Sequence, residues 1–148
     1  MAPSHATVLV TTDLSPLGDA ALAHAARLAR AYGARLVILS VVETPAPANP
    51  LYAHYYPTPT PAKVAKARTK LLHELEQRAA SLRSPEVEVE CVAVDGDPAA
   101  EILRAAKDRK VKALVISTHG RTGLKHFLLG SVAERVLKGT TCPVLLVR

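Results

Sequence analysis

Five short runs of apolar residues, rich in valine, leucine and isoleucine, alternate with helical patterns along this chain. That alternation constrains the fold more than any other feature. Several of the runs are almost continuously apolar, as expected of parallel strands that are covered on both faces. We expect strands at residues 7–11, 35–42, 87–94, 113–117 and 143–147.

Helical patterns fill the intervals between these strands. Ser15 followed by Pro16 predicts a helix start, because serine can cap an unpaired N–H and proline suits the first helical position. Gly33 predicts the end of that helix. Further helices are expected at residues 62–82, from Asp97-Pro98, and from residues 131–134, where Ser-Val-Ala-Glu has the pattern of a capping box.

The order of strands and helices predicts an open α/β fold with a five-stranded parallel sheet and helices on both faces, Rossmann-like in build. Right-handed crossovers leave few strand orders. We expect the order 3-2-1-4-5, with 2-1-3-4-5 as the competitor. With 148 residues, of which 49% are apolar, we expect residues 1–148 to form a single domain.

Composition excludes several classes of protein. The formal charge of +6 attracts anions, but aromatic residues make up only 3% of the chain, too few to stack nucleic-acid bases. No signal peptide and no run of about 20 apolar residues occurs, so we expect a soluble, cytoplasmic protein. Cys91 and Cys142 lie in apolar runs and are expected to be buried. They have no zinc-site spacing.

The segment 44–61 interrupts the regular alternation. It holds six prolines and three of the four tyrosines of the chain. A loop this long is usually functional or mobile. A solvated excursion, a lid over a ligand and a subunit contact all remain open as interpretations.

Two features fall where a ligand site is expected. In open α/β sheets, ligands bind beyond the carboxyl ends of the strands, at the point where the winding direction reverses. With the order 3-2-1-4-5 this point lies between the first and fourth strands. The first strand ends in Thr11-Thr12-Asp13, and the fourth ends in Ile116-Ser117 before Thr118-His119-Gly120.

The segment after the fourth strand is suited to phosphate. No acidic residue occurs between Asp108 and Glu134, and glycines precede a helix start, where unpaired N–H groups favour an anion. Simpler interpretations remain: turn glycines, a capping role for Ser131, and a turn role for Asp13. No Walker sequence is present. The cationic residues of this region are Lys110, Lys112, Arg121 and Lys125.

Ser117-x2-Gly120-x9-Gly130-Ser131, followed by Cys142-Pro-Val-Leu-Leu-Val-Arg148, closely resembles the universal stress protein family. Its ATP-binding members carry Gly-x2-Gly-x9-Gly-Ser/Thr. The resemblance extends over essentially the whole chain and includes Thr12-Asp13 and Ser40-Val41. It implies a regulatory, stress-response protein that binds ATP, ADP or AMP, with Mg²⁺ as a candidate companion of the triphosphate.

The resemblance also implies roles for single residues. The backbone of Val41 would hold the adenine, Asp13 with the adjoining Thr12 would lie near the ribose, and Ile116 and Ser117 would line the sugar side. The phosphates would be held by Gly120, Gly130, Ser131 and Val132, with Arg121 in the same loop. A homodimer is implied through the last strand, 143–147.

The chain departs from the family motif at Ser117, which stands where the first glycine is expected. If that position requires a positive φ, a non-glycine residue costs about 1–2 kcal/mol, or roughly tenfold in affinity. If φ is negative, only crowding against the sugar is at issue.

Four other functions are alternatives to nucleotide binding. A slow ATP hydrolase lacks a recognisable acid–base pair. A phosphoacceptor domain would need an acidic cluster after the first strand. A nonspecific nucleic-acid binder would depend on the net charge alone. A dimeric interaction module that works without nucleotide is the fourth.

Overall fold

The computed structural model describes residues 6–44, 50–52, 54–55, 58–119 and 129–148. Its sheet has five parallel strands in the order β3-β2-β1-β4-β5, as predicted, and the competing order 2-1-3-4-5 is wrong. The strands are β1 (Thr7–Thr11), β2 (Arg35–Glu43), β3 (Val89–Gly96), β4 (Ala113–Ser117) and β5 (Val144–Val147).

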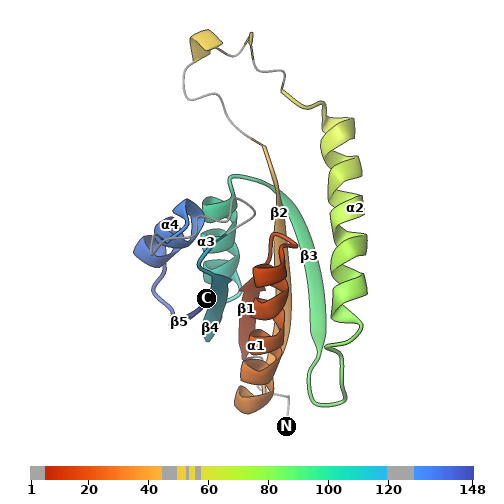
Figure 1. The fold of residues 1–148 in the computed structure, drawn as a ribbon, viewed down its shortest axis with the longest axis vertical. Coiled ribbons are helices and arrows are strands. Elements are labelled where there is room, and N and C mark those ends of the chain that lie inside the picture. Colours follow the sequence, from red (N-terminus) through yellow and green to blue (C-terminus); the bar gives the residue numbers. More distant parts are fainter. Residues whose placement is uncertain (1–5, 45–49, 53, 56–57, 120–128) are drawn as a thin grey trace.

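Four α-helices cover the two faces of the sheet: α1 (Pro16–Tyr32), α2 (Pro61–Ala79), α3 (Pro98–Asp108) and α4 (Ser131–Gly139). Helices α1 and α2 lie over one face, and α3 and α4 over the other (Figure 1). Successive residues of β1 divide between the two cores, because side chains of a strand alternate in direction. Val8 and Val10 pack toward α1, whereas Leu9 packs toward α3 and α4.

Local capping signals explain three helix starts. Ser15 Oγ accepts from the Gly18 amide at 3.1 Å, Asp97 accepts from Ala100 at 2.9 Å, and Thr60 accepts from Lys63 at 3.3 Å. At the other end of α1, Gly33 has φ +59°, a conformation that glycine adopts at low cost. These features confirm the predicted starts of α1 and α3.

Several predicted boundaries are wrong by a few residues. β3 begins at Val89 instead of Val87, since Val87 donates its amide to Ser84 in a turn, although its side chain is fully buried. α2 ends at Ala79 rather than at residue 82. Cys91 and Cys142 are only partly buried, because each packs at the margin of its core rather than within it.

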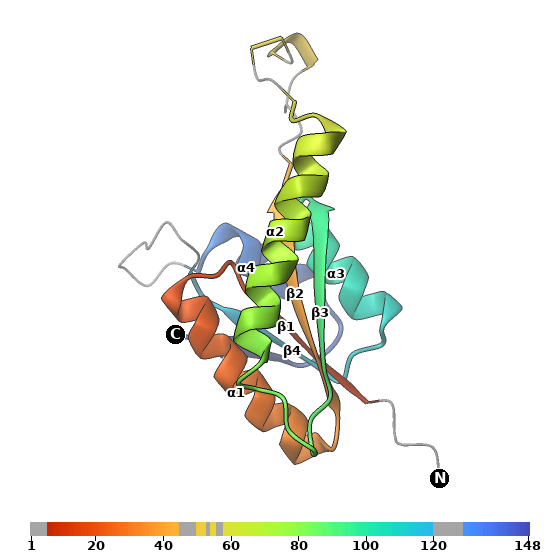
Figure 2. The ribbon, with the colours of Figure 1, turned by 90° about the vertical axis from the view of Figure 1, so that its right-hand side faces the viewer.

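Helix α2 extends beyond the sheet. Its first turns rise past the end of β3 (Figure 2). Near its C-terminal end, α2 is joined to α1 by the 2.7 Å ion pair between Arg78 and Asp19. Further toward its N-terminus, Arg68 pairs with Asp95 of β3 at 2.9 Å. Much of segment 44–61 lies outside the described residues. Its described part contains η1 (Pro50–Tyr52) and the strongly exposed side chains of Leu51 and Tyr55.

Candidate functional site

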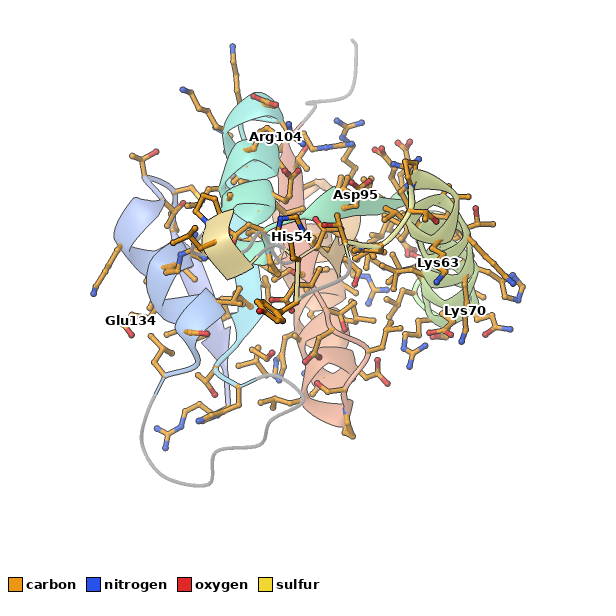
Figure 3. All side chains as sticks on the ribbon, turned by 90° about the horizontal axis from the view of Figure 1, so that it is seen from above. His54, Lys63, Lys70, Asp95, Arg104 and Glu134 are labelled. Atoms are coloured by element: carbon orange, nitrogen blue, oxygen red, sulfur yellow. The ribbon has the colours of Figure 1, made fainter. Side chains whose placement is uncertain are left out.

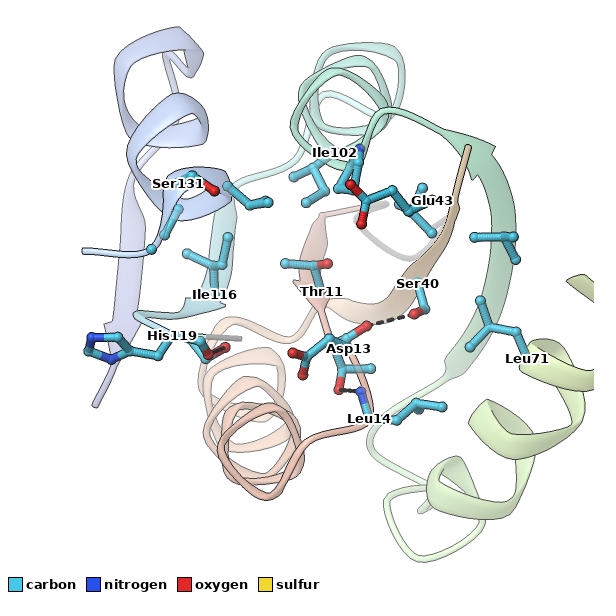
Figure 4. Close-up of a pocket in the computed structure, with 18 of the residues that line it drawn as sticks. Thr11, Asp13, Leu14, Ser40, Glu43, Leu71, Ile102, Ile116, His119 and Ser131 are labelled. Atoms are coloured by element: carbon cyan, nitrogen blue, oxygen red, sulfur yellow. Dashed lines mark hydrogen bonds between the residues drawn. The ribbon is translucent and has the colours of Figure 1, made fainter. Parts of the chain in front are cut away.

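A cavity of about 650 Å³ opens at the carboxyl ends of β1, β2 and β4, where the strand order predicts a ligand site (Figure 4). This volume lies within the ordinary range of small-molecule sites. The cavity lies between the first turn of α4 on one side and the middle of α2 on the other. Its described lining is Thr11–Leu14, Ser40–Glu43, Ala67, Lys70, Leu71, Glu74, Pro98, Ile102, Ile116–His119 and Gly130–Ala133.

The end of β1 forms a tight turn that presents Asp13 to the cavity. The Leu14 amide donates to Thr12 Oγ1 at 3.0 Å, and the Ser15 amide donates to Asp13 Oδ1 at 3.0 Å. Leu14 has φ +66°, which is an unfavourable conformation for a residue other than glycine. The side-chain hydrogen bonds of Thr12 and Asp13 therefore stabilise a strained turn, and they hold the Asp13 carboxylate in place.

The ends of β1 and β2 are joined by a buried contact. Ser40 Oγ donates to the Thr12 carbonyl oxygen at 2.6 Å (Figure 4). The Thr12 amide donates to the Leu39 carbonyl oxygen at 3.1 Å. Ser40 and Thr12 are 3% and 4% exposed, so the contact is shielded from water. Val41 follows directly and lines the cavity.

On the opposite side, α4 begins close to the end of β4. The Gly130 amide donates to the Thr118 carbonyl oxygen at 2.7 Å. Gly130, with extended backbone, is the N-cap of α4, and Ser131 is its first helical residue. The predicted capping box is therefore wrong, because Gly130 and not Ser131 is the N-cap, and no side chain makes a capping hydrogen bond at this helix start. The helix N-terminus carries partial positive charge and borders the cavity.

Ser117 occupies the last position of β4 and is half-buried. Among the described non-glycine residues only Leu14 and Lys110 have a positive φ, so Ser117 carries no such strain. Its hydroxyl donates to the His119 carbonyl oxygen at 3.1 Å, which folds the side chain back onto its own turn. The backbone penalty considered for Ser117 therefore does not arise. Steric crowding against the sugar is then the one effect at issue for this substitution.

His119 lies at the edge of the cavity and points away from Asp13 (Figure 4). Its Nδ1 lies 3.0 Å from Thr118 Oγ1. Its Nε2 is buried and has no hydrogen-bond partner in the part of the chain that the structure describes. The tautomer that places the proton on Nδ1 spares Nε2 an unpaired buried donor.

Comparison with known proteins identifies the family of this fold. Residues 5–148 match the sequence model of the universal stress protein family. The chain belongs to this family. Universal stress protein YxiE of Bacillus subtilis is 35% identical over 147 residues, which cover 95% of this chain and 97% of YxiE.

Two solved structures have the same fold. The structure of hypothetical protein MJ0577, reported as a structure-based assignment of biochemical function, superposes with a TM-score of 0.74 at 27% identity, over 97% of this chain and 95% of that one. The structure of a universal stress protein in complex with cAMP superposes with a TM-score of 0.66 at 26% identity, over 98% of both chains.

In this universal stress protein, eight of the ten predicted site residues line one cavity: Thr12, Asp13, Val41, Ile116, Ser117, Gly130, Ser131 and Val132. Gly120 and Arg121 lie outside the described residues. Lys110 and Lys112 were grouped with the phosphate loop, and this was wrong. Both precede β4 at the amino end of the sheet, where the Lys112 amide pairs with Thr7, so they lie at the end opposite the cavity.

Sequence reasoning did not anticipate the wall that α2 contributes. Ala67, Lys70, Leu71 and Glu74 have the i, i+3, i+4, i+7 spacing of one helix face, but the sequence does not show what that face meets. Viewed from above, Lys63 and Lys70 lie along α2 on one side of the molecule, and Glu134 lies along α4 on the other (Figure 3). Lys70 and Glu74 place both charge signs at the α2 side of the cavity.

Two kinds of feature are absent from the described residues. They contain no group of three or more His, Cys, Asp or Glu side chains arranged to hold a metal ion. Among them, too, no helix has the length and apolar character required to span a bilayer.

Proposed function

We propose that this universal stress protein binds an adenine nucleotide, ATP in the first place, and acts as a regulatory stress-response module rather than as an enzyme. One observation carries the proposal. The Asp13 turn after β1 and the Gly130–Ser131 start of α4 lie on the rim of a single cavity of about 650 Å³ at the switch point of the sheet.

The chemistry of the two sides suits the two ends of a nucleotide. A helix N-terminus with a glycine at its cap favours phosphate, and a carboxylate accepts hydrogen bonds from sugar hydroxyls. In this proposal Gly130, Ser131 and Val132 hold the phosphates, while Asp13 contacts the ribose. The solved structure of a family member with cAMP, at 26% identity, supports this class of ligand.

The remaining roles come from the resemblance to the family, and the presence of these residues in the cavity lining supports them. In this proposal the Val41 backbone faces the adenine, Ile116 and Ser117 line the sugar side, and Thr12 supports Asp13. Gly120 and Arg121 are assigned to the phosphates from the motif alone. Mg²⁺ usually keeps several waters and binds through substrate phosphates. The described residues offer no protein cage for the ion, so it would be held mainly by the triphosphate.

We propose that catalysis is not the main activity. Among the described residues, the cavity holds Asp13, Glu43, Lys70, Glu74 and His119 as ionisable candidates for acid–base chemistry, and His119 points away from Asp13. A slow hydrolase is the alternative. Release of ADP from bound ATP well above the Mg²⁺-only background, and lost in Asp13→Ala, would favour it.

The proposal includes a homodimer formed through β5. This strand is at the edge of the sheet and pairs with β4 alone among the described strands. Leu145 and Leu146 are 40% and 36% exposed there. An exposed apolar edge strand is a template for pairing with another chain.

Calorimetric titration of ATP into nucleotide-free protein tests the binding proposal. We expect saturable binding that Asp13→Ala weakens about tenfold or more, since a hydrogen bond to a charged group contributes about 1.5–3 kcal/mol. Asp108→Ala is the matched control, because Asp108 ends α3 away from the cavity. Absence of binding, or equal affinity of the Asp13 variant, would contradict the proposed site.

A further inference from the structure

We propose that Gly18 of α1 is a positioning residue for the nucleotide site. It has no side chain, and this allows the first turn of α1 to lie directly against Thr12 and Asp13. The inference rests on the proposed function, because its role is to hold the groups that would meet the nucleotide.

The space around Gly18 leaves no room for a methyl group. A Cβ atom added to Gly18 would lie 2.5 Å from Thr12 Oγ1, 3.0 Å from Asp13 Oδ1 and 3.3 Å from Ser15 Oγ. A carbon and an oxygen that are not bonded to each other do not approach to 2.5 Å, so an alanine here displaces its neighbours. The nearest two are side-chain atoms of the Asp13 turn.

Hydrogen bonds hold both of these atoms, Thr12 Oγ1 and Asp13 Oδ1, in place. Thr12 Oγ1 accepts the Leu14 amide and Asp13 Oδ1 accepts the Ser15 amide, each at 3.0 Å. These bonds stabilise a turn in which Leu14 has φ +66°. Thr12 is also only 4% exposed. Moving either oxygen therefore breaks a hydrogen bond that supports the turn.

The conformation of Gly18 itself does not require glycine. Among the described glycines only Gly33 and Gly96 have a positive φ, and Gly18 lies in the first turn of an ordinary helix. Alanine is the better helix former. The contact with Thr12 and Asp13 is therefore the feature of this position that demands glycine.

A double-mutant cycle of Gly18→Ala and Asp13→Ala, read out as ATP affinity, tests the inference. In the parent protein we expect Gly18→Ala to weaken ATP binding about tenfold, the loss expected when one charged hydrogen bond is misplaced. When Asp13→Ala is already present, we expect Gly18→Ala to change the affinity by less than about twofold, since the carboxylate that Gly18 positions has gone. A purely structural role would produce the same loss in both backgrounds.

Two further measurements separate positioning from destabilisation. Without nucleotide, amide hydrogen exchange at Leu14 and Ser15 should accelerate in Gly18→Ala, because the two bonds that protect those amides are disturbed. Gly33→Ala is the matched control. It also places alanine at a glycine of the α1 segment, with a strained φ of +59° but nothing within 4 Å, and it should leave ATP affinity unchanged.

Unchanged ATP affinity in Gly18→Ala, or an equal loss in both backgrounds, would overturn the inference while leaving the proposed function intact. Failure of the unaltered chain to bind ATP would instead contradict the proposed function, and the positioning role with it.

Discussion

The hydroxyl of Ser40 donates a 2.6 Å hydrogen bond to the carbonyl oxygen of Thr12, and both residues are almost fully buried. This contact joins the ends of two neighbouring strands at the point where β1 leaves the sheet. Because Thr12 begins the turn that carries Asp13, the position of the Asp13 carboxylate depends on β2 as well as on its own strand.

Removal of this hydroxyl should destabilise the fold. Ser40→Ala leaves the buried Thr12 carbonyl without this donor, and an unsatisfied buried polar group costs about 1–3 kcal/mol. We expect the free energy of unfolding, measured by urea titration, to fall by that amount. Ser81→Ala removes a comparable but exposed hydroxyl, which bonds Arg78 at 3.1 Å, and should change it little. Equal stability of the Ser40 variant and the parent would show that the contact contributes nothing.

Gly130→Ala should separate α4 from the end of β4. An added Cβ would lie 2.9 Å from the Thr118 carbonyl oxygen, and a main-chain atom yields less readily than a side chain. Since Gly130 has φ −59°, the effect comes from the contact and not from backbone strain. We expect ATP affinity to fall about tenfold or more in calorimetric titrations, if the first turn of α4 holds phosphate as proposed.

The control for this variant lies at the other end of the same helix. The atoms nearest to a methyl group at Gly139 would belong to the Leu103 side chain, which can rotate. Gly139→Ala should therefore retain ATP affinity. If both glycine variants lose affinity equally, general damage to α4 rather than the phosphate site would be the cause.

A lysine at Leu145 or Leu146 should disrupt the proposed homodimer, since like charges would face each other across the paired edges. We expect sedimentation to give the dimer mass for the parent and the monomer mass for each variant. Leu72→Lys on α2, where the leucine is 38% exposed, controls for the added charge. A monomeric parent, or a dimer that survives both β5 substitutions, would contradict this interface.

Cys91 should react slowly with alkylating reagents in the folded protein. Burial raises the pKa of its thiol from the ordinary 9.0 to about 11. Since the thiolate is the reactive form, alkylation at pH 8 should be about 100-fold slower than in urea-unfolded chain. A Cys142→Ser background makes Cys91 the only thiol, and comparable rates in the two states would refute the shift.

The same shift has a consequence for stability. The folded state keeps the Cys91 proton to higher pH than the unfolded state. The neutral thiol's contribution to the free energy of unfolding is therefore fully present below pH 9, and it is lost as the pH rises through about 11. Cys91→Ala should therefore show a shallower loss of stability over this interval than the parent. An identical pH dependence of both proteins would contradict the expected linkage.

Helix starts were predicted well where the signal is local. Ser15 and Asp97 cap their helices through bonds to amides three residues ahead, as their sequences indicate. The capping residue of α4 was predicted wrongly. The helix begins at Ser131, but its N-cap is Gly130, whose amide bonds to Thr118, twelve residues earlier in the chain.

In the candidate site, too, features with a local sequence signal were predicted, and features that depend on contacts between distant segments were not. Thr12, Asp13, Ser117 and Gly130 follow or precede recognisable strands and helices, so the sheet order was enough to bring them together. The α2 wall, the hydrogen bond of Ser40 and the approach of Gly18 to Thr12 could not be predicted. Each depends on contacts between elements, which the spacing of residues along one element does not reveal.

By itself, the sequence determined which segments form strands and helices. It also favoured one of two strand orders, and with that order it predicted the edge of the sheet at which a ligand would bind. Hydrophobic periodicity, capping residues and the handedness of crossovers act over short stretches of chain, so they can be read in one dimension. Only the tertiary structure decided how closely α1 approaches the Asp13 turn and how closely Gly130, the N-cap of α4, approaches Thr118. These distances result from packing between segments far apart in the chain, where a single methyl group is enough to change the outcome.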